Sequence, residues 1–72
     1  MSVETTSLAR PTERRIIRRP EVEQKVGLKR AQIYQLMKEK RFPQAIRLGV
    51  RAVGWYSVEI DEWIVERLKD RI

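Results

Sequence analysis

The stretch "PEVEQKVGLKRAQIYQLMKEKRFP", residues 20–43, carries the pattern that decides the fold. Pro20 suits the first turn of a helix, and Gly27 ends that helix after about two turns because glycine readily adopts the left-handed conformation. A second helix follows and ends at Phe42 and Pro43, since a residue before proline is pushed out of the helical region. Its apolar stripe comprises Ile33, Leu36, Met37 and the stem of Lys40. Two helices around a glycine turn predict a helix-turn-helix unit.

The face of the second helix opposite that stripe carries short, amide and basic side chains. At about 100° per residue, this face comprises Ala31, Gln35 and Lys38, with Gln32 and Tyr34 at its borders and Lys29 and Arg30 at its N-terminal end. Such side chains read base edges, because glutamine pairs with adenine, arginine with guanine, and alanine contacts the thymine methyl group. The Tyr34 hydroxyl can donate to a phosphate, and a partly buried aromatic ring is an equal alternative at that position. The pattern predicts a helix that enters the major groove of DNA.

Two short extended segments, residues 45–48 and 52–56, follow the second helix and predict a β-hairpin. Alternation places Ile46, Leu48, Val53 and Trp55 on the inward face and leaves Arg47 and Arg51 pointing outward. We expect these two arginines to contact a neighbouring phosphate or the minor groove, although a solvated role is the alternative for both. Arg18 and Arg19 are expected to add contacts to the DNA backbone. Gly54 suggests a close backbone approach or a bulge.

The ends of the chain complete one small domain. Ile16 and Ile17 suggest a short extended piece, and Ser57 is a predicted N-cap for a last helix. The buried stripe of that helix is expected to comprise Ile60, Trp63, Ile64 and Leu68. Both tryptophans are assigned to the core, because large aromatic side chains supply much of the apolar area that a small domain can bury. Residues 1–14 are polar and aperiodic, so they are predicted to form a flexible arm before a domain at residues 15–72.

Composition narrows the chemistry available to this chain. With 72 residues, most apolar side chains are needed for folding and few are left to build a deep substrate cleft. The chain contains no histidine and no cysteine, which removes the usual zinc ligands, thiol nucleophiles and the commonest general base. The acidic residues of the last helix suit its positive N-terminus better than a metal or acid/base site. We therefore expect no enzyme activity, no metal and no cofactor.

Charge and hydropathy indicate the compartment and the kind of partner. Sixteen Lys and Arg against ten Asp and Glu give a formal charge of +6, with the basic excess before residue 57 and an acidic excess after it. A basic body with an acidic closing helix is expected for a protein that binds a polyanion on one face. No apolar run approaches a membrane span and no export signal is visible, so the sequence predicts a cytoplasmic protein that does not bind membranes.

Several short motifs stand in a specific order along the chain. They are "G-L-x-R" at residues 27–30, "I-Y" at 33–34, "R-F-P" at 41–43, "R-A-V-G-W" at 51–55 and "I-D-E-W" at 60–63. The ordered set, over residues 16–70, resembles the AlpA family of small phage-related regulators, whose domain is similar to those of excisionases and MerR-type proteins. The resemblance implies a mainly α winged helix-turn-helix with a small β-hairpin as its wing and a C-terminal helix. It also implies that Arg30, Tyr34 and Gln35 lie on the recognition helix.

The chain departs from the usual pattern of that family at four positions. The family usually has Ser where Lys29 stands, a small residue at Glu23, Leu at Lys25 and Gly at Lys40. Lys29 cannot cap the second helix as Ser would, and polar residues at 23 and 25 weaken the buried face of the first helix. These changes affect the tightness of the first turn more than a role in DNA binding.

Two classes of function follow from the sequence. The leading hypothesis is a sequence-specific regulator of transcription on a prophage or other mobile element, sometimes joined to excision, that binds double-stranded DNA. A monomer that can assemble side by side on DNA is expected, because no coiled-coil extension is present. The alternative is a protein-interaction module, such as an adaptor or antitoxin-like partner, whose basic face binds an acidic protein. RNA is less favoured, because no exposed aromatic platform is predicted.

Overall fold

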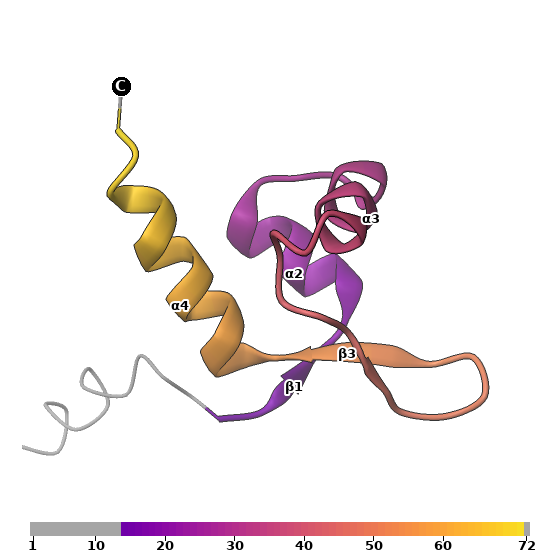
Figure 1. Ribbon diagram of the computed structural model, residues 1–72. Coiled ribbons are helices and arrows are strands. Elements are labelled where there is room, and N and C mark those ends of the chain that lie inside the picture. The colour runs from indigo at the N-terminus through magenta and orange to yellow at the C-terminus, as the bar shows by residue number, and fades with distance from the viewer. Residues whose placement is uncertain (1–13, 72) are drawn as a thin grey trace, which may run out of the picture.

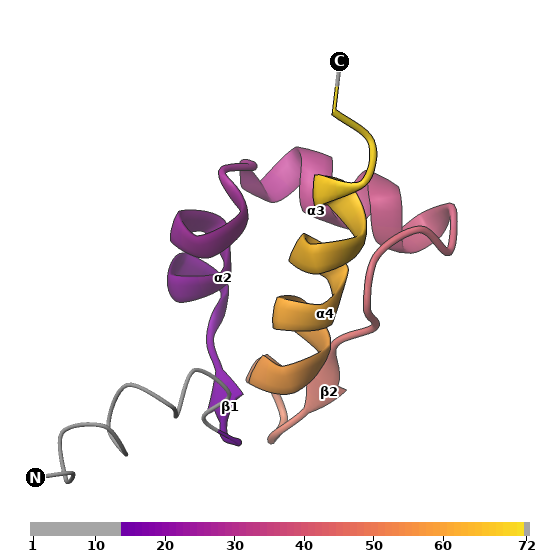
Figure 2. The same ribbon diagram turned by 90° about the vertical axis from the view of Figure 1, so that its left-hand side faces the viewer.

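Helices and strands in the computed structural model are described for residues 14–71, so the predicted arm lies outside the described residues except for Arg14. This part of the chain contains β1 (Ile16–Ile17), α2 (Arg19–Val26), α3 (Arg30–Lys38), β2 (Ile46–Arg47), β3 (Val53–Tyr56) and α4 (Ser57–Leu68). The strands form an antiparallel sheet in the order β1-β3-β2. The described helices lie on the same side of this sheet in both views (Figures 1 and 2). The predicted fold class, a small and mainly α winged helix-turn-helix, is confirmed.

The turn between α2 and α3 follows the sequence prediction. Pro20 lies in the first turn of α2, and Gly27 ends the helix with a φ of 74°. The Gly27 N–H donates to the Glu23 carbonyl at 2.8 Å, which closes the end of the helix. Val22 is fully buried and Val26 is partly buried on the same face. Local residue chemistry alone is therefore sufficient to place this turn.

The end of α3 differs from the prediction. The helix stops at Lys38, before Phe42 and Pro43, because Lys40 adopts a left-handed conformation with a φ of 64°. The Lys40 N–H donates to the Met37 carbonyl at 3.0 Å and the Arg41 N–H donates to the Leu36 carbonyl at 2.8 Å. This pair of bonds is the Schellman arrangement, in which the left-handed position is usually glycine. Lys40 is exposed, so the prediction that its stem joins the apolar stripe is wrong.

The register of the hairpin corrects the predicted alternation. Ile46 pairs with Gly54 and Arg47 pairs with Val53, and residues directly opposite each other share a face of a sheet. Arg47 therefore shares the face of Val53 and Trp55, whereas Ile46 lies on the opposite face. Ile46 and Leu48 are 38% and 45% exposed, so their assignment to the inward face is wrong. The loop between the two strands sets this register. It is closed by a hydrogen bond from the Leu48 N–H to the Ala52 carbonyl at 2.7 Å.

Gly54 lies at the centre of the sheet face that the helices leave bare. A Cβ atom at this position would collide with the Ile16 side chain, and would lie 3.0 Å from the Ile17 carbonyl oxygen and 3.1 Å from Leu48 Cδ1. Strand β3 lies between β1 and β2. The Ile16 and Leu48 side chains leave no space at position 54 for a residue larger than glycine. The predicted close approach at Gly54 is confirmed.

The core is built around Trp55. This side chain is fully buried with Ile17, Val22, Ile33 and Ile60, and Phe42 is buried beside them. The Trp55 Nε1–H donates to the Pro43 carbonyl at 3.0 Å, and the Trp63 Nε1–H donates to the Arg41 carbonyl at 2.9 Å. The two indoles thereby fasten the loop after α3 to β3 and to α4. The predicted core role is confirmed for Trp55, while Trp63 is partly buried and packs against the core.

The start of α4 also differs from the prediction. Ser57 is buried, and its Oγ accepts a hydrogen bond from the Arg15 N–H at 3.0 Å, while its own N–H donates to the Arg15 carbonyl at 2.8 Å. Tyr56 precedes the helix and makes no side-chain cap, so Ser57 as the N-cap of α4 is wrong. The Ser57 hydroxyl oxygen instead accepts from the backbone of Arg15, which lies 42 residues earlier in the sequence. Leu68, also assigned to the buried stripe, is 51% exposed because the apolar cluster ends at Ile64.

Candidate nucleic-acid interface

Four arginines from three separate elements converge on one hollow beside α3. They come from the start of α2, the first residue of α3 and the bend between β2 and β3. The hollow, named here the arginine hollow, is lined by Arg18, Arg19, Pro20, Arg30, Tyr34, Val50, Arg51 and Val53. Five of these residues were predicted from sequence to contact DNA. The fold brings them together across as many as 33 positions, from residue 18 to residue 51.

Most of the guanidinium groups in the arginine hollow are available to a ligand. Within residues 14–71, Arg18, Arg30 and Arg51 form no ion pair, whereas the Arg19 Nε–H donates to Glu23 Oε2 at 3.0 Å. The guanidinium of Arg30 lies 5.7 Å from the centre of the Tyr34 ring, which orients it by a cation–π contact. Guanidinium groups with free donors bind phosphate oxygens in a bidentate manner. The hollow therefore has the chemistry of a phosphate site.

Tyr34 is the partly buried aromatic residue that was one of the two roles considered for it, and its contact with phosphate stays a prediction. Its ring is partly buried and packs at a tilt against Trp55, with 6.4 Å between the ring centres. The same residue lines the arginine hollow. It therefore links the core to the hollow and holds Arg30 at the edge of that surface.

The outer face of α3 lies beside the arginine hollow. Ala31, Gln32 and Gln35 are exposed and line a shallow depression with Leu28 and Leu36. Gln32 Oε1 accepts a hydrogen bond from the Lys29 N–H at 3.0 Å. Gln32 therefore provides a capping hydrogen bond at the N-terminus of α3, which the ammonium group of Lys29 cannot provide because it has no acceptor. Lys29 and Lys38 are exposed at the two ends of the helix. Every predicted base-reading side chain of α3 is thus on the surface except Tyr34.

Two features of this surface were not anticipated from sequence. Arg47 is exposed on β2 but does not line the arginine hollow, although it shares the sheet face of Val53, which does. Gln35 is not free, since its Nε2–H donates to Glu39 Oε2 at 2.7 Å. The spacing of four residues between Gln35 and Glu39 is a helical signal that could have revealed this contact.

One ion pair fastens β1 to α2 next to the arginine hollow. The Arg15 guanidinium donates two hydrogen bonds to the Glu21 carboxylate, the longer of them at 3.2 Å. These hydrogen bonds hold the pKa of Glu21 below its ordinary value of 4.5. Both side chains are exposed, so the pair orients the start of α2 more than it stabilises the fold.

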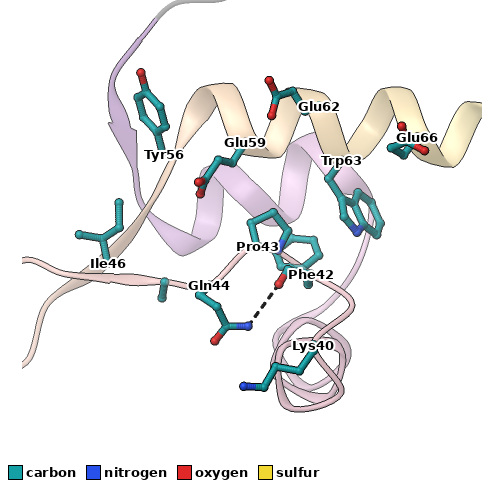
Figure 3. Close-up of a pocket in the computed structure, with 11 residues that line it drawn as sticks. Lys40, Phe42, Pro43, Gln44, Ile46, Tyr56, Glu59, Glu62, Trp63 and Glu66 are labelled. Carbon is teal, nitrogen blue, oxygen red and sulfur yellow. Dashed lines mark hydrogen bonds between the residues drawn. The ribbon is translucent and has the colours of Figure 1, made fainter.

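A second hollow, the acidic groove, lies between α4 and the loop after α3 (Figure 3). Its apolar lining comes from Phe42, Pro43, Ala45, Ile46, Tyr56 and Trp63, and its polar lining from Lys40, Gln44, Glu59, Glu62 and Glu66. Glu59 and Glu62 form no ion pair with the described residues, whereas Glu66 pairs with Lys69 at 3.4 Å. The Gln44 Nε2–H donates to the Phe42 carbonyl at 3.3 Å along the groove (Figure 3). Its carboxylates would repel phosphate, so this surface does not suit DNA.

The described part of the chain does not provide a metal site or a membrane-spanning helix. Between residues 14 and 71, no group of three acidic or other metal-ligating side chains is placed to hold a metal ion. No helix in that range is long and apolar enough to cross a membrane.

Comparison with known proteins bears on the family. The model of the family described as "Prophage CP4-57 regulatory protein (AlpA)" matches residues 15–68. This chain belongs to the AlpA family. The AlpA resemblance predicted from the ordered motifs is thereby confirmed.

Two curated relatives extend the AlpA comparison. One, named "DNA-binding transcriptional activator AlpA", from Escherichia coli (strain K12), is 46% identical over 61 residues, which cover 76% of this chain and 87% of the relative. Another, named "Uncharacterized protein ORF88", from Enterobacteria phage P4, is 37% identical over 60 residues, which cover 83% of this chain and 68% of the phage protein. No solved structure gives a significant match.

Proposed function

We propose that this AlpA family member is a small regulator that binds double-stranded DNA in a sequence-specific manner and acts on genes of a prophage or other mobile element. The observation that carries the proposal is the arginine hollow, where unpaired guanidinium groups meet at the edge of α3. The name of the Escherichia coli relative, a DNA-binding transcriptional activator, supports the same class of function. An excisionase-like role remains part of the hypothesis.

The proposed mode of binding follows from dimensions and charge. A helix with its side chains is about 10–12 Å in diameter, which fits a major groove about 12 Å wide, and the nine residues of α3 would lie along the groove for about 14 Å. With α3 in the groove, a phosphate of the flanking backbone would enter the arginine hollow. Base edges would face the α3 side chains, while Arg47 would contact a neighbouring phosphate. The proposed base-facing set is Lys29, Arg30, Ala31, Gln32, Tyr34, Gln35 and Lys38.

The remaining properties are proposed from the same surface. Residues 15–72 would form the binding domain, and the protein would act in the cytoplasm as a monomer that can assemble side by side on DNA. We assign no catalytic step to it. The guanidinium groups of the arginine hollow and the exposed amides of α3 suit docking rather than chemistry on a substrate.

A salt titration with the intact chain tests the proposal. If about six phosphates are neutralised, the logarithm of the affinity for duplex DNA should fall with the logarithm of salt concentration at a slope of about −5. Fluorescence anisotropy with a labelled random duplex measures this slope, and footprinting on DNA flanking its own gene measures specificity. No binding to random duplex at low salt would defeat the proposal and favour the alternative, in which the basic face binds an acidic protein.

A further inference from the structure

Glu39 occupies a position on α3 that electrostatics disfavours. It is the C-cap residue of the helix, where the backbone carries a partial negative charge, and its side chain is 40% exposed. Its neighbours on the outer face are amide and basic groups on the surface proposed to approach phosphates. Its contacts, with Gln35 and with Arg41 at 3.5 Å, are exposed and contribute little to stability. Folding therefore gives little reason for a carboxylate here.

The hydrogen bond from Gln35 directs this carboxylate onto the reading face. Helical side chains lean toward the N-terminus, and residues four apart lie on the same face of a helix. Glu39 Oε2 accepts from Gln35 Nε2 at 2.7 Å, so the carboxylate is held one turn back from the end of α3. The 3.5 Å contact of Oε1 with Arg41 is long, so this oxygen has lone pairs available for another donor.

The chemistry of a carboxylate limits what it can bind in the major groove. An ionised carboxylate only accepts hydrogen bonds, and the donors in that groove are the amino groups of cytosine and adenine. Adenine presents its N7 acceptor beside the amino group, whereas cytosine presents the donor alone. We propose that the Gln35–Glu39 couple reads a cytosine, with Glu39 accepting from its amino group and Gln35 acting as a positioning residue. This inference rests on the proposed function.

Selection from a random duplex pool, followed by sequencing of the bound fraction, tests the couple. The wild-type chain should enrich a motif in which one position prefers cytosine over the other bases by about tenfold, the scale of one good base contact. Glu39→Ala should lose that preference and no other, and Gln35→Ala should weaken it at the same position. Glu39→Gln should shift the preference toward adenine, because glutamine pairs with the donor and acceptor of that base.

The control is a carboxylate on the other surface. Glu62→Ala, in the acidic groove, should leave every position of the motif unchanged. Glu39→Ala should also bind random duplex about two- to fivefold more tightly at low salt, because one negative charge is removed near phosphate. Thermal unfolding of each variant checks that the fold is retained.

The outcomes separate this inference from the proposed function. If the wild-type chain binds DNA and Glu39→Ala keeps the complete motif, Glu39 does not read a base and the inference fails alone. A loss of preference at an A·T base pair, in place of a C·G pair, would also overturn it. If the wild-type chain binds no duplex at all, the proposed function fails and the inference fails with it.

Discussion

The arginine hollow and the acidic groove are two concave surfaces of the same small domain with opposite charge. They share no lining residue, and the sheet residues that line them come from opposite faces of the sheet, Val53 for the hollow and Ile46 and Tyr56 for the groove. Each has aromatic lining, Tyr34 in the hollow and Phe42 with Trp63 in the groove. What differs is the charge at the rim.

This difference shows how a short chain can orient itself on a polyanion. Net charge of +6 attracts DNA to the molecule as a whole, but carries no information about which surface should meet it. The carboxylates of Glu59 and Glu62, which pair with no cation in residues 14–71, repel DNA from the acidic groove. The guanidinium groups attract DNA to the arginine hollow. The core holds the two surfaces apart, so experiments on the core and on each rim can test whether they are independent.

The largest expected effect is the loss of both surfaces together. Trp55→Ala should destabilise the fold by about 3–5 kcal/mol, because it removes the largest fully buried side chain. A core in a domain of this size rarely supplies more than that amount, so the variant should be unfolded at room temperature. Circular dichroism during heating measures the transition. Trp63→Ala, at a partly buried position, should remain folded with a lower melting temperature, and a cooperative melt of Trp55→Ala near that of wild type would contradict this account.

A smaller effect should distinguish the two rims. Arg51→Ala should weaken DNA binding about tenfold on all sequences alike and reduce the salt slope by about 1, since it removes a phosphate contact. Arg67→Ala removes the same charge from α4, where the guanidinium lies 5.4 Å from the Trp63 ring, and should change affinity less than about twofold. Anisotropy titrations at several salt concentrations measure both. Equal losses of affinity would mean that only net charge matters and that the two surfaces do not differ in DNA binding.

The smallest effect concerns the junction between α3 and the acidic groove. Lys40→Gly should stabilise the fold by about 1 kcal/mol, because Lys40 has a positive φ that costs a residue with a Cβ atom. Lys38→Gly, within the helix, should instead destabilise it by about 1 kcal/mol. Urea unfolding measures both. DNA affinity of Lys40→Gly should stay unchanged, since Lys40 lines the groove and not the hollow, and a loss of stability would show that the left-handed turn is not strained.

The predictions that held depended on neighbours in the sequence. Pro20 and Gly27 placed the start and end of α2 because proline and glycine restrict the backbone locally. Trp55 was assigned to the core from its spacing in the strand and from its size, and the fold agrees. The end of α3 was missed because Lys40 takes a conformation for which its own residue type gives no signal.

The predictions that failed depended on pairing between distant segments. Ser57 was predicted as an N-cap, but its hydroxyl oxygen accepts a hydrogen bond from the backbone of Arg15. No local pattern in the sequence could indicate this contact. The faces of Ile46 and Arg47 depended on a register set by the loop, and a shift of one residue exchanges the two faces of a strand. Arg47 was also grouped with Arg51, although only Arg51 lines the arginine hollow.

Residue type and spacing along the chain are sufficient to predict the helical hairpin around Gly27, the basic and amide side chains of α3, and membership of the AlpA family through the order of its motifs. They are sufficient because these features act within a few residues. The fold is needed to show that Arg18, Arg19, Arg30 and Arg51 line one hollow and that Glu59 and Glu62 line another. Such convergence follows from how β1, β2 and the helices pack around Trp55, and packing is a property of contacts between segments far apart in the chain.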